Sequence, residues 1–153
     1  MTMIAETMND VLTITRALHR QLADNLAESA SDAPEREKEL LEYLAEHEDE
    51  LARILEIFQK ESDLAPLNTW FYLYTDRHSI VKRNMSQVPF AEMDANEISE
   101  EVANFHNQMI DLYNHLHERA ESDSARQVLS QLLDVETSKG RTIIFESERS
   151  AKH

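Results

Sequence analysis

Glycine and cysteine are almost or wholly missing from the sequence, which has one glycine, three prolines and no cysteine in 153 residues. Phosphate-binding loops and dinucleotide-binding turns need several glycines, so both kinds of site are excluded. The lack of cysteine excludes disulfides, thiolate metal ligands and cysteine nucleophiles, and it is typical of a reducing compartment. Because the N-terminal region is also acidic and has no apolar signal core, we expect a cytoplasmic protein.

Basic residues are also scarce: the sequence has 15 Lys and Arg residues against 30 Asp and Glu residues, which gives a formal net charge of -15. A chain this acidic repels the phosphates of nucleic acids and the surface of anionic membranes. No apolar run approaches the ~20 residues that a membrane-spanning helix needs. We therefore expect no nucleic-acid partner and no membrane partner.

Apolar residues instead recur every three or four positions, which is the spacing of one face of an α-helix. This pattern predicts four helices, at about residues 3–29, 33–61, 95–122 and 123–149. The length of the chain is that of one domain, so we expect residues 1–153 to form a single all-α unit.

Two capping boxes support these boundaries. Asp32 followed by Glu35, and Asp94 followed by Glu97, have the spacing at which two side chains satisfy each other's backbone N–H groups at a helix start. Both pairs predict the beginning of a helix.

Residues 62–94 separate the second and third helices and are rich in aromatic residues. Four of them are Trp70, Phe71, Tyr72 and Tyr74. A short helix at about residues 68–83 fits the local pattern. We predict an antiparallel four-helix bundle in which this long crossover carries the extra short helix. Packed aromatic residues fit either a lid over the bundle or a homodimer surface.

Polar residues interrupt the apolar faces near the middle of the helices. They are His19 in the first helix, His47 and Glu48 in the second, His106 in the third and Glu136 in the fourth. The middles of bundled helices lie at one level, so these side chains are candidates for a common buried site. The alternative is that each histidine is a neutral, hydrogen-bonded core residue.

The segment from Tyr113 to Ala120, followed by Leu132 to Glu136, resembles the third-to-fourth helix hairpin of rubrerythrin-like proteins in the ferritin-like superfamily. This resemblance implies a ferritin-like bundle. It also implies a di-iron site held by one Glu from each of two helices and by Glu-x-x-His from each of the other two.

Two of these six ligand positions match the family pattern. Glu48 and Glu136 stand at the two Glu-x-x-His glutamates, but Leu51 and Lys139 stand where the histidines belong. His106 stands where the third helix supplies a Glu, and the first helix has no central Glu. The resemblance therefore implies a degenerate di-iron site.

Lys139 offers one explanation for this pattern, because its ammonium could pair with Glu136 and replace the charge of the metal. Our leading hypothesis is then a non-enzymatic ferritin-like protein without a cofactor. It would act by assembly or partner binding, as a homodimer through residues 62–94.

A metal-binding protein is the alternative hypothesis. Its ligands would be Glu48, His106 and Glu136 with His47 or His19, holding iron or manganese for rubrerythrin-like redox chemistry. A small-ligand site in the bundle core is a third hypothesis.

Overall fold

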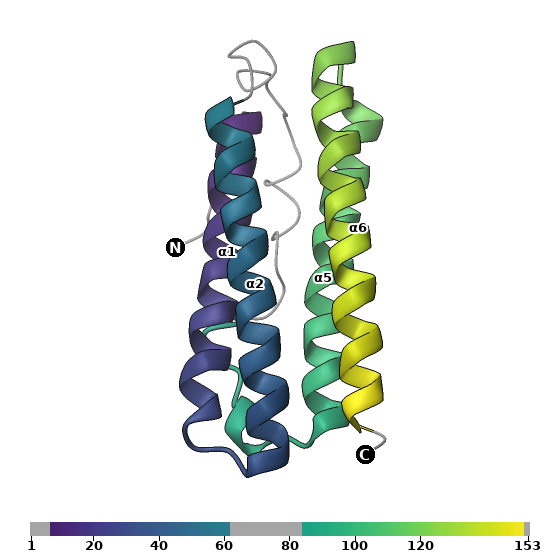
Figure 1. Cartoon of the computed structure of the whole chain (residues 1–153). Helices are drawn as coiled ribbons and strands as arrows, with labels where there is room; N and C mark the ends of the chain where they lie inside the picture. Colours follow the sequence, from purple (N-terminus) through teal and green to yellow (C-terminus); the bar gives the residue numbers. More distant parts are fainter. Residues whose placement is uncertain (1–6, 62–83, 152–153) are drawn as a thin grey trace.

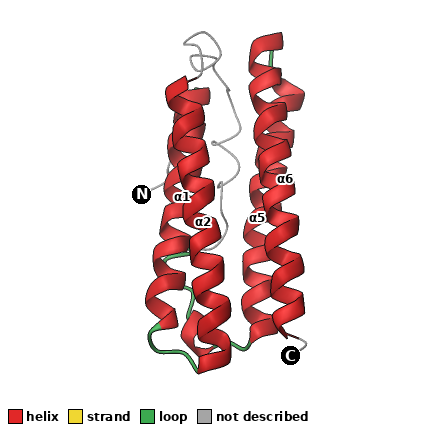
Figure 2. Ribbon diagram, in the orientation of Figure 1, coloured by secondary structure: helices red, strands yellow, loops and turns green. Residues whose placement is uncertain are grey.

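Four α-helices make up the fold of the residues that the structure, a computed structural model, describes. The structure describes residues 7–61 and 84–151, with only the backbone for residues 142–151. The helices are α1 (Met8–Ala30), α2 (Glu35–Glu61), α5 (Ala95–Arg119) and α6 (Asp123–Ala151). They lie side by side as a bundle, and no strand occurs in the described residues (Figures 1 and 2). The prediction of an all-α fold is confirmed.

The helix ends differ by a few residues from the predicted ones. α2 begins at Glu35, with the Lys38 backbone N–H donating to the Pro34 carbonyl at 2.8 Å, so Asp32 lies too early to be its N-cap. α5 ends at Arg119 because Ala120 takes an extended conformation. Residues 3–6 of the first predicted helix lie outside the described part of the chain.

A capping box starts α5 as predicted. The Asp94 carboxylate accepts from the Glu97 backbone N–H at 2.8 Å, and the Glu97 carboxylate accepts from the Asp94 N–H at 3.2 Å. A second capping box, between Thr7 and Asp10, starts α1. These bonds satisfy backbone donors that the first turn of a helix leaves unpaired.

The helices pack as two hairpins. A short turn joins α1 to α2, another joins α5 to α6, and the closest packing lies within each pair (Figure 1). The hairpins meet mainly where α2 faces α6, with further contact between α2 and α5. The largest fully buried side chains include Tyr113, Phe90, Phe105, Met8, Leu12, Leu22, Leu26, Leu41, Leu44, Leu51, Leu55 and Ile98. Burying each such side chain stabilises the fold by about 1.5–3 kcal/mol, so this core is the main source of its stability.

The described end of the crossover lies against α1. A short 3-10 helix, η1 (Phe90–Glu92), buries Phe90 completely. The Asn25 side-chain amide on α1 donates to the carbonyls of Met85 and Val88 at 2.8 and 2.9 Å. The short helix predicted at about residues 68–83, and most of the predicted dimer surface, lie outside the described residues.

Candidate functional site: a buried ring of histidine and glutamate

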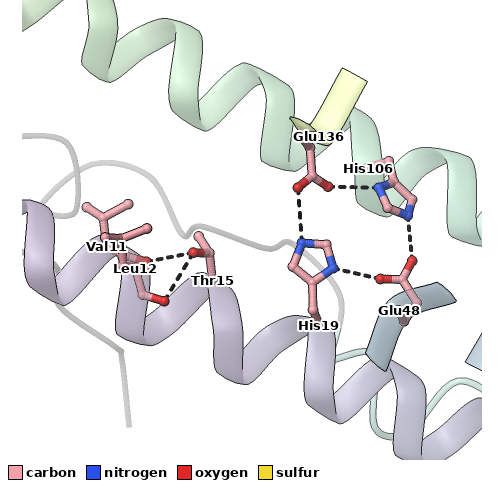
Figure 3. A network of polar contacts seen from close by, with 7 residues as sticks. All are labelled: Val11, Leu12, Thr15, His19, Glu48, His106 and Glu136. Carbon is pink, nitrogen blue, oxygen red and sulfur yellow. Dashed lines mark hydrogen bonds and ion pairs between the residues drawn. The ribbon is translucent and has the colours of Figure 1, made fainter. Parts of the chain in front are cut away.

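Five polar or charged side chains are buried in the described core: Thr15, His19, Glu48, His106 and Glu136. The Thr15 hydroxyl donates to the carbonyls one turn before it in α1, as Figure 3 shows. The other four are ionisable, and each comes from a different helix. Burying ionisable groups is costly unless they are paired, so their mutual geometry decides what the site can do.

These four side chains form a closed ring, which we call the His–Glu ring (Figure 3). His19 on α1 contacts Glu48 on α2 through Nδ1 at 2.6 Å and Glu136 on α6 through Nε2 at 3.2 Å. His106 on α5 contacts Glu136 through Nδ1 at 2.8 Å and Glu48 through Nε2 at 2.5 Å. Every nitrogen and every carboxylate oxygen in the ring has a partner within the ring.

Each of the four contacts between a nitrogen and a carboxylate oxygen needs one proton, and all four protons are on nitrogen when both imidazoles are doubly protonated and donate from both nitrogens. Burial disfavours the charged imidazolium of His19, but the carboxylates of Glu136 and Glu48 outweigh it and raise its pKa from 6.5 to about 9. For His106 the same balance raises the pKa from 6.5 to about 10. Two imidazolium groups therefore face two carboxylates, and the ring as a whole is neutral.

The glutamates stay ionised because the positive charges of the imidazolium groups stabilise their carboxylates. Burial disfavours the carboxylate of Glu136, but the His19 and His106 imidazolium groups outweigh it and lower its pKa from 4.5 to about 2. The pKa of Glu48 is lowered as well, because His106 and His19 more than offset its burial. The ring is thus held together by four charge-assisted hydrogen bonds in a site without solvent exposure.

Neighbouring residues fix the orientation of the imidazoles. The Phe105 ring meets the His19 ring edge to face, with centroids 5.1 Å apart. Gly140, a buried residue inside α6, leaves room for His106: a Cβ atom there would lie 3.6 Å from the Cβ, Cγ and Nδ1 atoms of His106. The single glycine of the chain therefore lies where α6 approaches the ring.

The structure brings together three of the four predicted metal-site residues, Glu48, His106 and Glu136. The fourth, His47, is half-buried outside the ring, where its imidazole lies against the Tyr43 ring with centroids 4.3 Å apart and ring planes tilted by 47°. His19 takes the remaining place. Sequence reasoning named His19 only as an alternative ligand, because it lies at the edge of the apolar face of its helix.

The prediction of an ion pair between Lys139 and Glu136 is wrong. The Lys139 ammonium donates instead to Glu50 on α2 at 2.7 Å, and both side chains are about a third or more exposed. The positive charges that face Glu136 come from His19 and His106. Lys139 fails to reach the core because a step of three residues turns it toward the rim of the α2–α6 contact.

The nitrogen and oxygen atoms of the ring are not arranged as the ligands of a di-iron centre. These atoms point at one another, and Leu51, at one of the two histidine positions, is completely buried among apolar residues. Within residues 7–61 and 84–141, no group of three or more His, Asp or Glu side chains is arranged to hold a metal ion. What the ring holds is a set of protons, which are shielded from solvent and shared by strong hydrogen bonds.

Two further features are not part of the ring. The buried Tyr113 hydroxyl faces Thr15 without a hydrogen bond of ordinary geometry, and burial raises its pKa. A groove of about 500 Å³ lies between α5 and α6, lined by Ile110, Asn114, Leu133, Asp134, Thr137, Ser138 and Arg141. No ring residue lines this groove, so it gives no access to the ring.

Comparisons with protein-family models, curated proteins and solved structures gave no match to this chain. Among the described residues, no helix combines the length and apolar character that crossing a membrane requires.

Proposed function

We propose that this chain is a non-catalytic, ferritin-like bundle with antiparallel helices, in which the His–Glu ring stands in place of a metal site. The protein acts by assembly or partner binding, as a homodimer, and needs no cofactor. The observation that carries the proposal is that all eight nitrogen and oxygen atoms of the ring are paired within it.

A closed ring suits a structural role better than a catalytic one. A general acid or base must reach a substrate, and a metal ligand must offer a free lone pair toward the ion. The ring has neither property, because its four side chains are at most 1% exposed and their polar atoms are occupied. Two imidazolium charges here balance the carboxylates, which is the task that metal ions perform in the family that the sequence resembles.

Metal content tests this proposal against the metal-binding alternative. The protein is purified without chelator, one portion is reloaded with ferrous iron, and iron and manganese are measured by mass spectrometry. We expect less than about one tenth of a metal ion per chain, and a melting temperature that a chelator does not change. The control is Glu136→Ala, which should leave any trace metal unchanged.

Near-stoichiometric metal that disappears in Glu136→Ala would overturn the proposal. It would support a metal-binding protein with Glu48, His106, Glu136 and His19 as ligands.

A second test replaces the whole ring by apolar residues. The variant with His19→Leu, Glu48→Leu, His106→Leu and Glu136→Leu should fold with a free energy of unfolding equal to or above that of the wild type. Circular dichroism and urea unfolding measure this. A variant that is unfolded would contradict this expectation, because the ring would then contribute stability that apolar packing does not replace.

A further inference from the structure

The His–Glu ring divides evenly between the two hairpins. In each hairpin the first helix supplies the histidine and the second supplies the glutamate, with separations of 29 residues from His19 to Glu48 and 30 from His106 to Glu136. Two ring bonds lie within hairpins and two cross between them. Each hairpin therefore carries half of a ring, and the two halves have the same chemical pattern.

A half ring cannot satisfy itself. Within the α1–α2 hairpin, His19 Nδ1 pairs with Glu48 Oε2, but His19 Nε2 and Glu48 Oε1 find their partners only in the other hairpin. In an apolar core, an unpaired N–H group or carboxylate oxygen strongly destabilises the fold. The hairpins are thus bound by complementary polar groups as well as by apolar packing.

The hairpins are also distinct units of the chain. Each is closed by a short turn, whereas residues 62–94 separate them in the sequence. The closest helix packing lies within hairpins (Figure 1). Exchange of identical elements between two copies of a chain is a low-cost route to a dimer, because each exchanged bundle regains the contacts of the monomer.

We propose that two copies of this chain exchange hairpins, so that the α1–α2 hairpin of each chain completes its ring with the α5–α6 hairpin of the other. Each bundle of this dimer then contains one full His–Glu ring, with two residues from each chain. The described segment 84–94 moves with α5 and docks on the other chain's α1, where Asn25 binds the same two carbonyls. This inference rests on the proposed function, because it identifies a second copy of the chain as the binding partner.

The test uses two full-length variants with complementary lesions. One carries His19→Leu and Glu48→Leu, and the other carries His106→Leu and Glu136→Leu. Each variant alone buries an unmatched half ring against leucine. An exchanged dimer of one copy of each has one complete ring and one fully apolar core, so both bundles are matched.

One variant is labelled with nitrogen-15, the two are unfolded together and refolded, and the dimers are counted by native mass spectrometry. We expect the ratio of mixed dimers to same-variant dimers to exceed the random ratio, which is one to one in an equal mixture, by about tenfold or more, which corresponds to about 1.4 kcal/mol per dimer. The matched control is labelled and unlabelled wild type treated alike, in which mixed dimers should occur only at the random share.

Two results would overturn the inference: variants that remain monomeric after joint refolding, or mixed dimers at the random share. If neither variant refolds, the mixture of labelled and unlabelled wild type tests the inference. Mixed wild-type dimers that form on joint refolding, but not when folded chains are mixed, support exchange. If the wild type gives only monomers, or if folded chains form mixed dimers as fast as jointly refolded chains do, the inference is overturned. Stoichiometric metal would contradict the proposed function instead, so the two failures are distinguishable.

Discussion

At the scale of single residues, the four ring side chains depend on one another more than any other group of the described core. Apolar core residues lose contacts in proportion to the atoms removed. Replacing a ring residue by a neutral one instead leaves its two charged partners buried without their counter-charge. The same neutral ring can be removed as a whole at little cost, so single and combined substitutions should have opposite effects.

His106→Gln tests this dependence. The amide cannot carry the positive charge that Glu48 and Glu136 both face at 2.5 and 2.8 Å. We expect the free energy of unfolding to fall by about 3–5 kcal/mol, measured by urea denaturation. The control is His117→Gln, because His117 makes one partly buried contact with Ser130 at 3.1 Å, and its loss should cost about 1 kcal/mol or less. Equal losses in the two variants would contradict the assigned role of the ring.

The pH dependence of stability follows from the raised histidine pKa values. His19 and His106 titrate at about 9 and about 10 in the folded chain, against 6.5 ordinarily, so the folded chain binds more protons between these values. Their contribution to stability is complete below pH 6.5 and is lost as the pH rises through 9 to 10. For Glu136, with a pKa of about 2 against 4.5, the contribution is complete above pH 4.5 and is lost as the pH falls toward 2.

We therefore expect the highest melting temperature between pH 4.5 and 6.5, with a marked decline toward alkaline pH. Thermal unfolding followed by circular dichroism at stepped pH measures it. The variant with four leucines in the ring should lack most of the alkaline decline, because His19 and His106 are absent from it. It is a matched control, since it keeps every other titrating group. A wild-type curve that stays flat from pH about 7 to about 9.5 would contradict the protonated ring.

At the scale of helices, α6 approaches the ring closely at Gly140. A glycine inside a helix is about 1 kcal/mol less favourable than alanine, so the contacts at this position decide which side chains could replace it. The space above its Cα is occupied by the His106 side chain, at a distance that one methyl group can share but a larger side chain cannot.

Gly140→Ala should therefore be neutral or should stabilise the protein by up to about 1 kcal/mol. Gly140→Leu should destabilise it by about 1–3 kcal/mol, because the larger side chain displaces His106. Urea unfolding compares the two variants, and the alkaline decline in melting temperature reports whether the ring survives. If Gly140→Leu left both measurements unchanged, His106 would not be packed against α6.

At the scale of the whole molecule, the excess of acidic residues opposes compaction. The formal net charge of the chain is -15, and among the described residues only Glu48 and Glu136 are buried acidic side chains. Dissolved salt screens the repulsion between exposed charges, whereas the neutral ring is buried beyond the reach of salt. The two kinds of electrostatic interaction should respond differently to ionic strength.

Raising the ionic strength from about 0.01 M to about 0.15 M should raise the wild-type melting temperature by about 2–4 °C, equivalent to about 1 kcal/mol. The destabilisation caused by His106→Gln should be nearly the same at both salt concentrations. Thermal unfolding of the two proteins at each concentration checks both statements. A penalty for His106→Gln that shrank strongly with salt would place the ring in contact with solvent.

The sequence by itself determined the four helices, the capping box at Asp94 and three of the four ring residues. These features depend on local spacing, since a repeat of three or four positions defines the buried face of a helix whatever its neighbours are. Glu48, His106 and Glu136 lie well inside such faces, so their burial followed from the pattern.

Only the tertiary structure decided which side chains pair. Successive residues of a helix, such as His47 and Glu48, are turned by about 100°, and residues three apart, such as Glu136 and Lys139, by about 60°, so the members of each pair point to different neighbours once the helices are packed. Whether a residue at the edge of a face reaches the core depends on the rotation of each helix against the others, which no single helix specifies. That rotation placed His19 in the ring and directed Lys139 to Glu50, whereas His47 contacts Tyr43, which lies four residues before it on the same helix.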